Sequence, residues 1–340
     1  MSIPSAPAVR RVARLIGIGA AGALVATTLG VGAAAAAPIS GDTVDCAPLG
    51  LTDVDGGRLV ANWEGIQKDR SNYTEAEVAA SEADFQARMA ALGFDLDLED
   101  IRDPITVDTY FHIVREDRTV DGGNIPRTWL RAQMKYLNHS YRGHGHSAVG
   151  ARSPFHFQLS GATRTTNQDW FRHADESDVE LEMKTALREE SSTAETLNIY
   201  LTNLINGGLL GYAWLPNHYD TPNGPVLDGL VVESQSLPGG SAAPYDLGGT
   251  VVHEAGHWFG LLHTFQGGCN DKDRVDDTPA QSGPTTGCPV GADTCAAPGE
   301  DPIHNYMDYS YDVCYDQFTI GQRERMLDQW FAYREGVPLQ

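Results

Sequence analysis

The chain has 340 residues, 41% of them hydrophobic, which suffices for one large globular domain or two ordinary ones and excludes a fully disordered chain. A formal net charge of −22 and a pI near 4.7 argue against a nucleic acid or an anionic membrane as the partner. We expect most of this acidity to keep an extracellular protein soluble, and part of it to be available for calcium.

The N-terminus has the features of an export signal. Arg10, Arg11 and Arg14 form a basic start, and residues 15–37 carry no charge and end in small alanines suited to cleavage. The sequence therefore predicts a signal peptide over residues 1–37 and a secreted, extracellular protein without membrane attachment after cleavage. An uncleaved anchor is the alternative, because the run could span a bilayer, but no basic stop-transfer cluster follows it. The paired arginines leave open whether export uses the general secretory or the twin-arginine route.

Residues 38–100 are predicted to form a prosegment rather than a domain. They are acidic and contain a single clear helix, which a capping box of Thr74 and Glu77 begins and Gly93 ends. A lone helix cannot enclose a core, so we expect it to lie on the surface of a catalytic domain that is predicted over residues 101–340. Its expected apolar stripe consists of Ala79, Phe85, Met89 and Leu92.

The catalytic domain has the pattern of a mixed sheet covered by helices. Apolar alternation and short apolar runs predict strands at 105–113, 155–159, 197–201, 210–215 and 230–233. Helical spacing predicts helices at 126–141, 179–187 and 250–259, and a capping box of Thr319 and Gln322 begins a final helix. Glycine, proline, aspartate and cysteine dominate the chain before that helix, so this segment is expected to be irregular. The fold class is therefore α/β or α+β.

Four of the five cysteines lie close together, at Cys269, Cys288, Cys295 and Cys314. In an exported protein they predict two disulfides, with three possible pairings. A four-cysteine zinc site is the alternative, but the close Cys-x-x-Cys pairs of such sites are absent from the sequence. Cys46 is left over.

A metal-binding motif begins at residue 253, where the sequence reads H-E-A-G-H-W-F-G-L-L-H. On a helix His253 and His257 project from one face, and Gly260 lets the chain fold back so that His263 can reach the same ion. Three neutral imidazoles on Zn²⁺ leave a position for water, whose pKa falls to about 7 in such sites, and Glu254 can reach that water. The whole motif has odds of less than about one in ten thousand by composition, so chance is a poor explanation.

The sequence resembles the metzincin zinc metalloproteases, and within them the pappalysin (cytophagalysin/ulilysin-like) family. The resemblance covers residues 100–335, and its motifs are the histidine motif, D-D-T-P at 276–279 and D-P-I-H-N-Y-M-D-Y at 301–309. It implies a zinc endopeptidase with a twisted mixed sheet in an upper subdomain, residues 101–263. It also implies an irregular, disulfide-linked lower subdomain, residues 264–340, that ends in a helix.

The resemblance also implies roles for individual residues. His253, His257 and His263 would bind zinc, Glu254 would be the general base, and Tyr309 would stabilise the oxyanion. Met307 would form the methionine turn under the metal, and the disulfides would be Cys269–Cys295 and Cys288–Cys314. The related family holds calcium in the loop after His263, where Asp273 and Thr278 are the preferred side-chain ligands; a solvated run of aspartates is the alternative. The substrate would pair with a strand at Gly211, Tyr212, Ala213 and Trp214, and Asp312, which follows the methionine turn, could favour a basic substrate residue.

Cys46 suggests how the precursor is kept inactive. Its thiolate could occupy the fourth zinc position, a mechanism that the resemblance supports. An unpaired cysteine of no consequence and an intermolecular disulfide are the alternatives, and a lipid-modified cysteine is disfavoured because Asp45 precedes it.

The sequence therefore predicts a secreted, monomeric zinc endopeptidase that cleaves proteins or peptides and is made as a latent zymogen. A catalytically silent binding module on the same fold is the alternative, and Glu254 argues against it because binding alone needs no general base. A zinc hydrolase of non-peptide substrates is a third possibility, which the prosegment and the predicted substrate strand disfavour.

Overall fold

The computed structural model describes residue 70 and residues 73–93, 103–143, 150–205, 208–270 and 273–337. All of them belong to one compact unit, Asp53–Gln340, and none to the other unit, Met1–Thr52. The predicted signal peptide and Cys46 therefore lie outside the described residues. Within the described ranges, every helix is too short or too polar to cross a membrane.

A five-stranded sheet with the order β2-β1-β3-β5-β4 forms the centre of the fold. Four strands are parallel, namely β1 (Ile105–Arg115), β2 (Phe155–Thr166), β3 (Leu197–Thr202) and β5 (Leu230–Glu233). The edge strand β4 (Gly211–Ala213) is antiparallel to β5, with Tyr212 opposite Val231. All five strands overlap the predicted ranges, but β2 continues to Thr166, well beyond its predicted end at Leu159. Strand β4 is shorter than expected, because the chain leaves the sheet after Ala213 and enters the 3₁₀ helix η3 (Pro216–Asp220).

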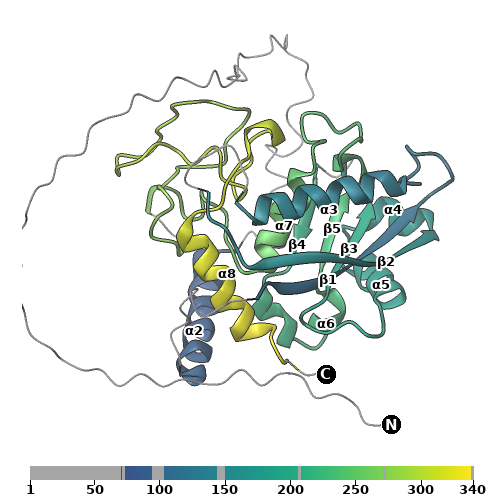
Figure 1. Cartoon of the computed structure of the whole chain (residues 1–340), viewed down its shortest axis with the longest axis horizontal. Helices are drawn as coiled ribbons and strands as arrows, with labels where there is room; N and C mark the ends of the chain where they lie inside the picture. The colour runs from purple at the N-terminus through teal and green to yellow at the C-terminus, as the bar shows by residue number, and fades with distance from the viewer. Residues whose placement is uncertain are drawn as a thin grey trace, which may run out of the picture. The chain divides into compact units, whose positions relative to one another are not determined.

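Alternate side chains of the strands point into two different cores. On one face, Ile199, Ala213 and Val232 join the main core with α3 (Arg127–Tyr141), α7 (Gly249–Trp258) and α8 (Ile320–Tyr333). On the other face, Tyr200 and Tyr212 join a smaller core with α4 (Gln168–His173) and α5 (Ser177–Leu187). Figure 1 shows α3 along one face of the sheet and α5 along the other. Burial on both faces explains why β3 and β5 are buried along their whole length.

The remaining described elements are short. They are α6 (Gly224–Leu227), η3 (Pro216–Asp220), η4 (Ser234–Ser236), η5 (Gly268–Asn270) and η6 (Asp312–Cys314). Most of the chain between α7 and α8 is irregular, as predicted. It contains the two disulfides that the resemblance implied, Cys269–Cys295 and Cys288–Cys314, and each of them closes a sequence separation of 26 residues.

The N-terminal helix α2 (Glu75–Leu92) packs beside α8 (Figure 1). The predicted capping box at Thr74 is present, and Gly93 ends the helix in a left-handed conformation, with φ 69°. The predicted apolar stripe was partly wrong, because Val78 and Phe85 are the buried residues, whereas Ala79 and Leu92 are exposed. The contacting face is thus rotated from the expected one, since it is defined by the surface on which the helix docks.

Candidate metal centre

Helix α7 brings two histidines to one face, and the turn that follows adds a third. His253 and His257 are four residues apart, so their rings leave the helix on the same side. The helix ends at Trp258, and Gly260 turns the chain with a φ of 89°, a conformation that favours glycine. The Nε2 atom of His257 then lies 3.1 Å from Nε2 of His253 and 3.0 Å from Nε2 of His263. All three side chains are buried.

Hydrogen bonds to backbone carbonyls orient two of these rings. Nδ1–H of His253 donates to the carbonyl of Tyr306 at 2.6 Å, and Nδ1–H of His257 donates to the carbonyl of Leu261 at 2.8 Å. With the proton on Nδ1, each ring presents the lone pair of Nε2 to the other rings.

This geometry fits a zinc ion. Lone pairs that face one another at such short range repel, and a cation between them turns that repulsion into attraction. Tetrahedral Zn²⁺ with Zn–N bonds of about 2.0–2.1 Å separates its ligand nitrogens by roughly 3.3 Å, close to the separations found here. The donor set also fits, because uncharged imidazoles suit zinc better than the oxygen-seeking calcium and magnesium ions.

Glu254 lies beside the histidines and directly against β4. A Cβ atom added at Gly211 would lie 2.8 Å from both Cγ and Oε1 of Glu254 and 3.0 Å from Cγ2 of Thr250. Strand β4 therefore passes over the carboxylate at a distance that only glycine allows. Because β4 is the edge strand of the described sheet, the carboxylate and the three imidazoles lie next to a strand edge that another strand could extend.

Met307 packs beneath α7. It is fully buried, and a Cβ atom added at Gly256, between the two helical histidines, would lie 2.3 Å from its Sδ atom. The backbone N–H of Thr264, next to His263, donates to the carbonyl of Met307 at 3.2 Å. Met307 thus contacts both α7 and the segment that carries the third histidine.

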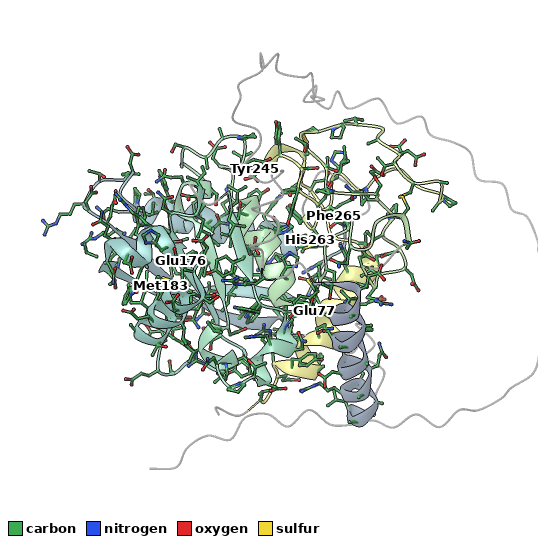
Figure 2. All side chains as sticks on the ribbon, turned by 180° about the vertical axis from the view of Figure 1, so that it is seen from behind. Glu77, Glu176, Met183, Tyr245, His263 and Phe265 are labelled. Atoms are coloured by element: carbon green, nitrogen blue, oxygen red, sulfur yellow. A yellow bond between two sulfur atoms is a disulfide. The ribbon has the colours of Figure 1, made fainter. Side chains whose placement is uncertain are left out.

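Aromatic rings enclose the third histidine. The ring of Tyr309 lies 4.9 Å from that of His263 and 5.6 Å from that of His253, measured between centroids. Phe265 stacks on His263 at 4.7 Å and 9° (Figure 2). Phe265 was not among the predicted site residues, although its position two residues after the third histidine was a signal that could have indicated it.

The Asp312 carboxylate binds the backbone at the start of α7. Its Oδ2 atom accepts hydrogen bonds from the backbone N–H groups of Leu247 at 2.9 Å and Gly249 at 3.1 Å. Its Oδ1 atom is buried without a hydrogen-bond partner. Burial raises the pKa of Asp312 to about 7, and the negative charge of Asp246 acts in the same direction. No local pattern around Asp312 indicated this helix-supporting role, and a contact between Asp312 and a basic substrate residue stays a prediction.

The four residues of the predicted substrate strand divide into two groups. Gly211 faces Glu254, and Ala213 joins the main core. Tyr212 points to the opposite face, where its hydroxyl donates to the carbonyl of Ala174 at 2.5 Å. Trp214 Nε1–H donates to Glu180 Oε1 at 3.3 Å. With their side chains engaged in this way, these residues have mainly their backbone to offer a substrate.

The loop after the third histidine contains buried oxygen atoms. Asp273 and Thr278, the predicted calcium ligands, are both buried, and Oδ1 of Asp273 accepts the backbone N–H of Val275 at 3.0 Å. Asp308, which sequence reasoning missed, accepts hydrogen bonds on Oδ1 from Gln281 Nε2 and Thr285 N, each at 3.0 Å. Burial raises the pKa of Asp308. This carboxylate joins the methionine turn to the loop.

Comparisons with known proteins give a consistent picture. Residues 183–330 match the Peptidase_M43 family, described as pregnancy-associated plasma protein-A. Extracellular metalloprotease 1 of Coccidioides posadasii is 44% identical over 251 residues, which cover 73% of this chain and 85% of that protein. An extracellular metalloprotease of Pyricularia oryzae is 43% identical over 264 residues, covering 77% and 83%.

Solved structures of a bacterial relative have a similar fold. Promirolysin of Tannerella forsythia matches with a TM-score of 0.64 at 26% identity, covering 79% of this chain and 92% of that one. Mature mirolysin in complex with a cleaved peptide matches with a TM-score of 0.56 at 29% identity, covering 66% and 90%.

Proposed function

The chain belongs to the Peptidase_M43 family and is a secreted zinc metalloprotease, and from this premise we propose the roles of its residues. His253, His257 and His263 bind one catalytic Zn²⁺, and Glu254 is the general base. The observation that carries this assignment is the convergence of three buried Nε2 atoms beside Glu254, directly under strand β4.

The chain's own residues then perform the proton transfers. Bound zinc supplies a Lewis acid that lowers the pKa of a water to about 7 and polarises the scissile carbonyl. Glu254 accepts the proton of the attacking water and delivers it to the nitrogen of the leaving amine. The Tyr309 hydroxyl donates a hydrogen bond to the carbonyl oxygen as that oxygen becomes negative. Its ring contacts with His253 and His263 support this role.

The substrate is a protein or peptide that pairs with the edge of β4. An extended peptide that runs antiparallel to β4 gains backbone hydrogen bonds along Gly211–Ala213 and brings one of its carbonyl groups over Glu254. The close approach of Gly211 to Glu254 supports this placement. Because the bonds are made by the backbone, we expect weak sequence selectivity along this strand.

The protein is made as a latent, exported precursor. Residues 1–37 direct secretion, residues 38–100 form the prosegment, and the thiolate of Cys46 blocks the fourth zinc position until the prosegment is cut. The names of the fungal relatives, extracellular metalloproteases, support secretion, and a relative solved in its pro-form supports latency. The test is Cys46→Ser, which should raise the activity of the uncut precursor at least tenfold, whereas unchanged activity would argue against a cysteine ligand.

Calcium binding in the loop after His263 is a separate proposal. The burial of Asp273 and Thr278 supports it, because buried oxygens of this kind suit a hard cation. Calorimetric titration of the metal-free protein with CaCl₂ should give one binding site that Asp273→Asn weakens, and a flat titration would contradict it.

The decisive test compares casein digestion by the wild type, Glu254→Gln and the control Glu324→Gln, which changes an exposed glutamate on α8. Loss of the base should lower kcat by about 10²–10⁴-fold, whereas the control should match the wild type. A chelator should abolish activity, and added zinc should restore it. Equal cleavage by Glu254→Gln and the wild type would refute the assignment. A wild type that has lost its prosegment and holds one zinc, yet cleaves nothing, would favour the silent binding module.

A further inference from the structure

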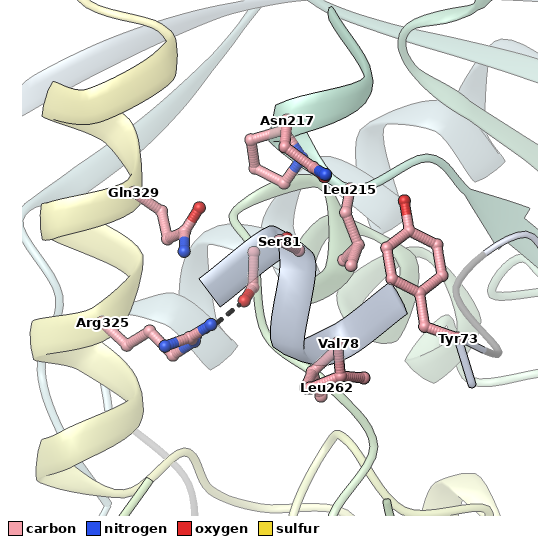
Figure 3. A pocket seen from close by; sticks show the side chains of 10 residues that line it. Tyr73, Val78, Ser81, Leu215, Asn217, Leu262, Arg325 and Gln329 are labelled. Carbon is pink, nitrogen blue, oxygen red and sulfur yellow. Dashed lines mark hydrogen bonds between the residues drawn. The ribbon is translucent and has the colours of Figure 1, made fainter. Parts of the chain in front are cut away.

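One face of α8 holds the turn that connects the second and third histidines. The residues involved are Arg325 and Gln329 on α8 and Arg334, the residue that caps its C-terminal end. They contact the backbone between Trp258 and Gly260. Figure 3 shows Arg325 and Gln329 projecting from α8 toward the space that Leu215 and Leu262 line.

Arg334 binds the end of the zinc helix from a fully buried position. Its Nε and Nη2 atoms donate to the carbonyl of Trp258 at 3.0 and 2.6 Å, and its guanidinium lies 3.5 Å from the centroid of the Trp258 ring. The last carbonyls of a helix lack partners within the helix and favour a cation. Asp228 balances the buried charge, since it contacts both Nη atoms at 3.2 and 3.3 Å and accepts Nε1–H of Trp258 at 2.9 Å.

Arg325 binds the next part of the turn. Its Nε–H donates to the carbonyl of Gly260 at 3.1 Å, and its Nη2 atom lies 2.8 Å from Oε2 of Glu82 on α2. A Cβ atom added at Gly260 would lie 2.6 Å from Cγ and Cδ of Gln329, so α8 also touches the turn directly. In the precursor, Glu82 of the proposed prosegment also holds the guanidinium from the opposite side.

The turn that follows α7 determines the positions of two histidines. Its Leu261 carbonyl accepts the Nδ1–H of His257, and two residues later the chain reaches His263. A shift at Gly260 would therefore move the hydrogen bond that orients the second ring and the backbone that carries the third. We propose that Arg325 and Arg334 are positioning residues for the metal site, which fix the geometry of His257 and His263 through the carbonyls of Gly260 and Trp258.

This inference rests on the proposed function only for the identity of the metal ligands. It is tested in the activated protein, from which the prosegment has been cut, with Arg325→Gln, the conservative Arg325→Lys and the control Arg323→Gln, a neighbouring arginine on α8 that pairs with Glu324 at 3.3 Å. Arg334→Lys is a second variant. Arg325 takes precedence because its side chain is 10% exposed whereas that of Arg334 is 1% exposed, so a folded variant is easier to obtain. Three quantities are measured: zinc dissociation into a chelator well below the unfolding temperature, kcat and KM on a peptide, and hydrogen exchange of amides 258–263 in metal-free protein.

For Arg325→Gln we expect zinc to dissociate three- to tenfold faster, kcat to fall by a similar factor and KM to stay unchanged. Loss of an outer hydrogen bond commonly weakens a metal site by such factors or more. Exchange of amides 258–263 should rise, Arg325→Lys should recover part of each effect, and Arg323→Gln should match the wild type. Faster exchange with unchanged zinc dissociation would overturn the inference and leave the proposed function intact, as would equal effects of Arg325→Gln and Arg323→Gln.

Discussion

Replacing the buried carboxylate of Asp312 by an amide should remove a pH dependence from the stability of this protein. Asp312 has an ordinary pKa of 3.8 that burial raises to about 7, so the folded protein holds a proton on it at pH values where the unfolded chain does not. The stabilising effect of that proton is complete below about pH 4 and is lost as the pH rises through about 7. Stability should therefore decrease with pH in this window.

The size of the effect follows from the shift in pKa. A shift of roughly three units corresponds to about 4 kcal/mol in the free energy of unfolding, with a slope of at most about 1.4 kcal/mol per pH unit. Asp312→Asn keeps the shape of the side chain and one oxygen that can accept the N–H groups of Leu247 and Gly249, but it cannot ionise. The wild type should therefore lose stability relative to this variant as the pH rises from 4.5 to 7.5.

The measurement is urea unfolding of both proteins at four pH values across that range. Both carry Glu254→Gln to prevent autolysis, and both are studied without metal so that metal binding does not add its own pH dependence. Subtracting the pH dependence of the unfolding free energy of the variant from that of the wild type cancels the contributions of the other titrating groups. A difference in unfolding free energy that stays constant from pH 4.5 to 7.5 would refute the argument, because it would mean that Asp312 ionises normally in the folded protein.

Three further predictions follow from the contacts around the site. Gly211→Ala adds a Cβ atom 2.8 Å from Glu254 and should lower kcat at least tenfold at unchanged zinc content, as measured by peptide hydrolysis and metal analysis. Gly256→Ala places a Cβ atom 2.3 Å from Sδ of Met307 and should cost about 1–3 kcal/mol in thermal unfolding, whereas Gly283→Ala, which meets no atom within 4 Å, should cost much less. Reduction of the two disulfides, each with a separation of 26 residues, should lower stability by about 3.5 kcal/mol per bond in the chain-entropy estimate, and an unchanged melting temperature would contradict this.

The elements that sequence periodicity predicted well are those whose pattern reflects burial. Helix α8 buries Met326, Trp330 and Tyr333, the face that its spacing indicated, and β5 has the bounds that its apolar run predicted. The stripe of α2 was less well predicted, because a helix that docks on a finished surface buries whatever that surface contacts. Its buried Val78 packs with Leu215 and Leu262, which no local pattern could reveal.

The candidate site shows the same division between local and distant information. The three histidines could be read from the sequence because eleven consecutive residues place them, through helical spacing and one glycine. The residues that bind the two ends of α7 could not be identified from the sequence. Asp312 is 63 residues from Gly249, and Arg334 is 106 residues from Asp228. Such pairs leave no periodic trace in the sequence.

The sequence by itself determined the three-histidine motif with Glu254 inside it and the order of strands and helices, since each of these depends on residues within a few turns of one another. Only the tertiary structure decided that β4 crosses Glu254 at Gly211, that Asp312 supports the start of α7, and that arginines of α8 hold its end. These contacts join segments far apart in the chain. They are fixed by how helices and strands pack together, which is a property of the folded molecule and not of any local run of residues.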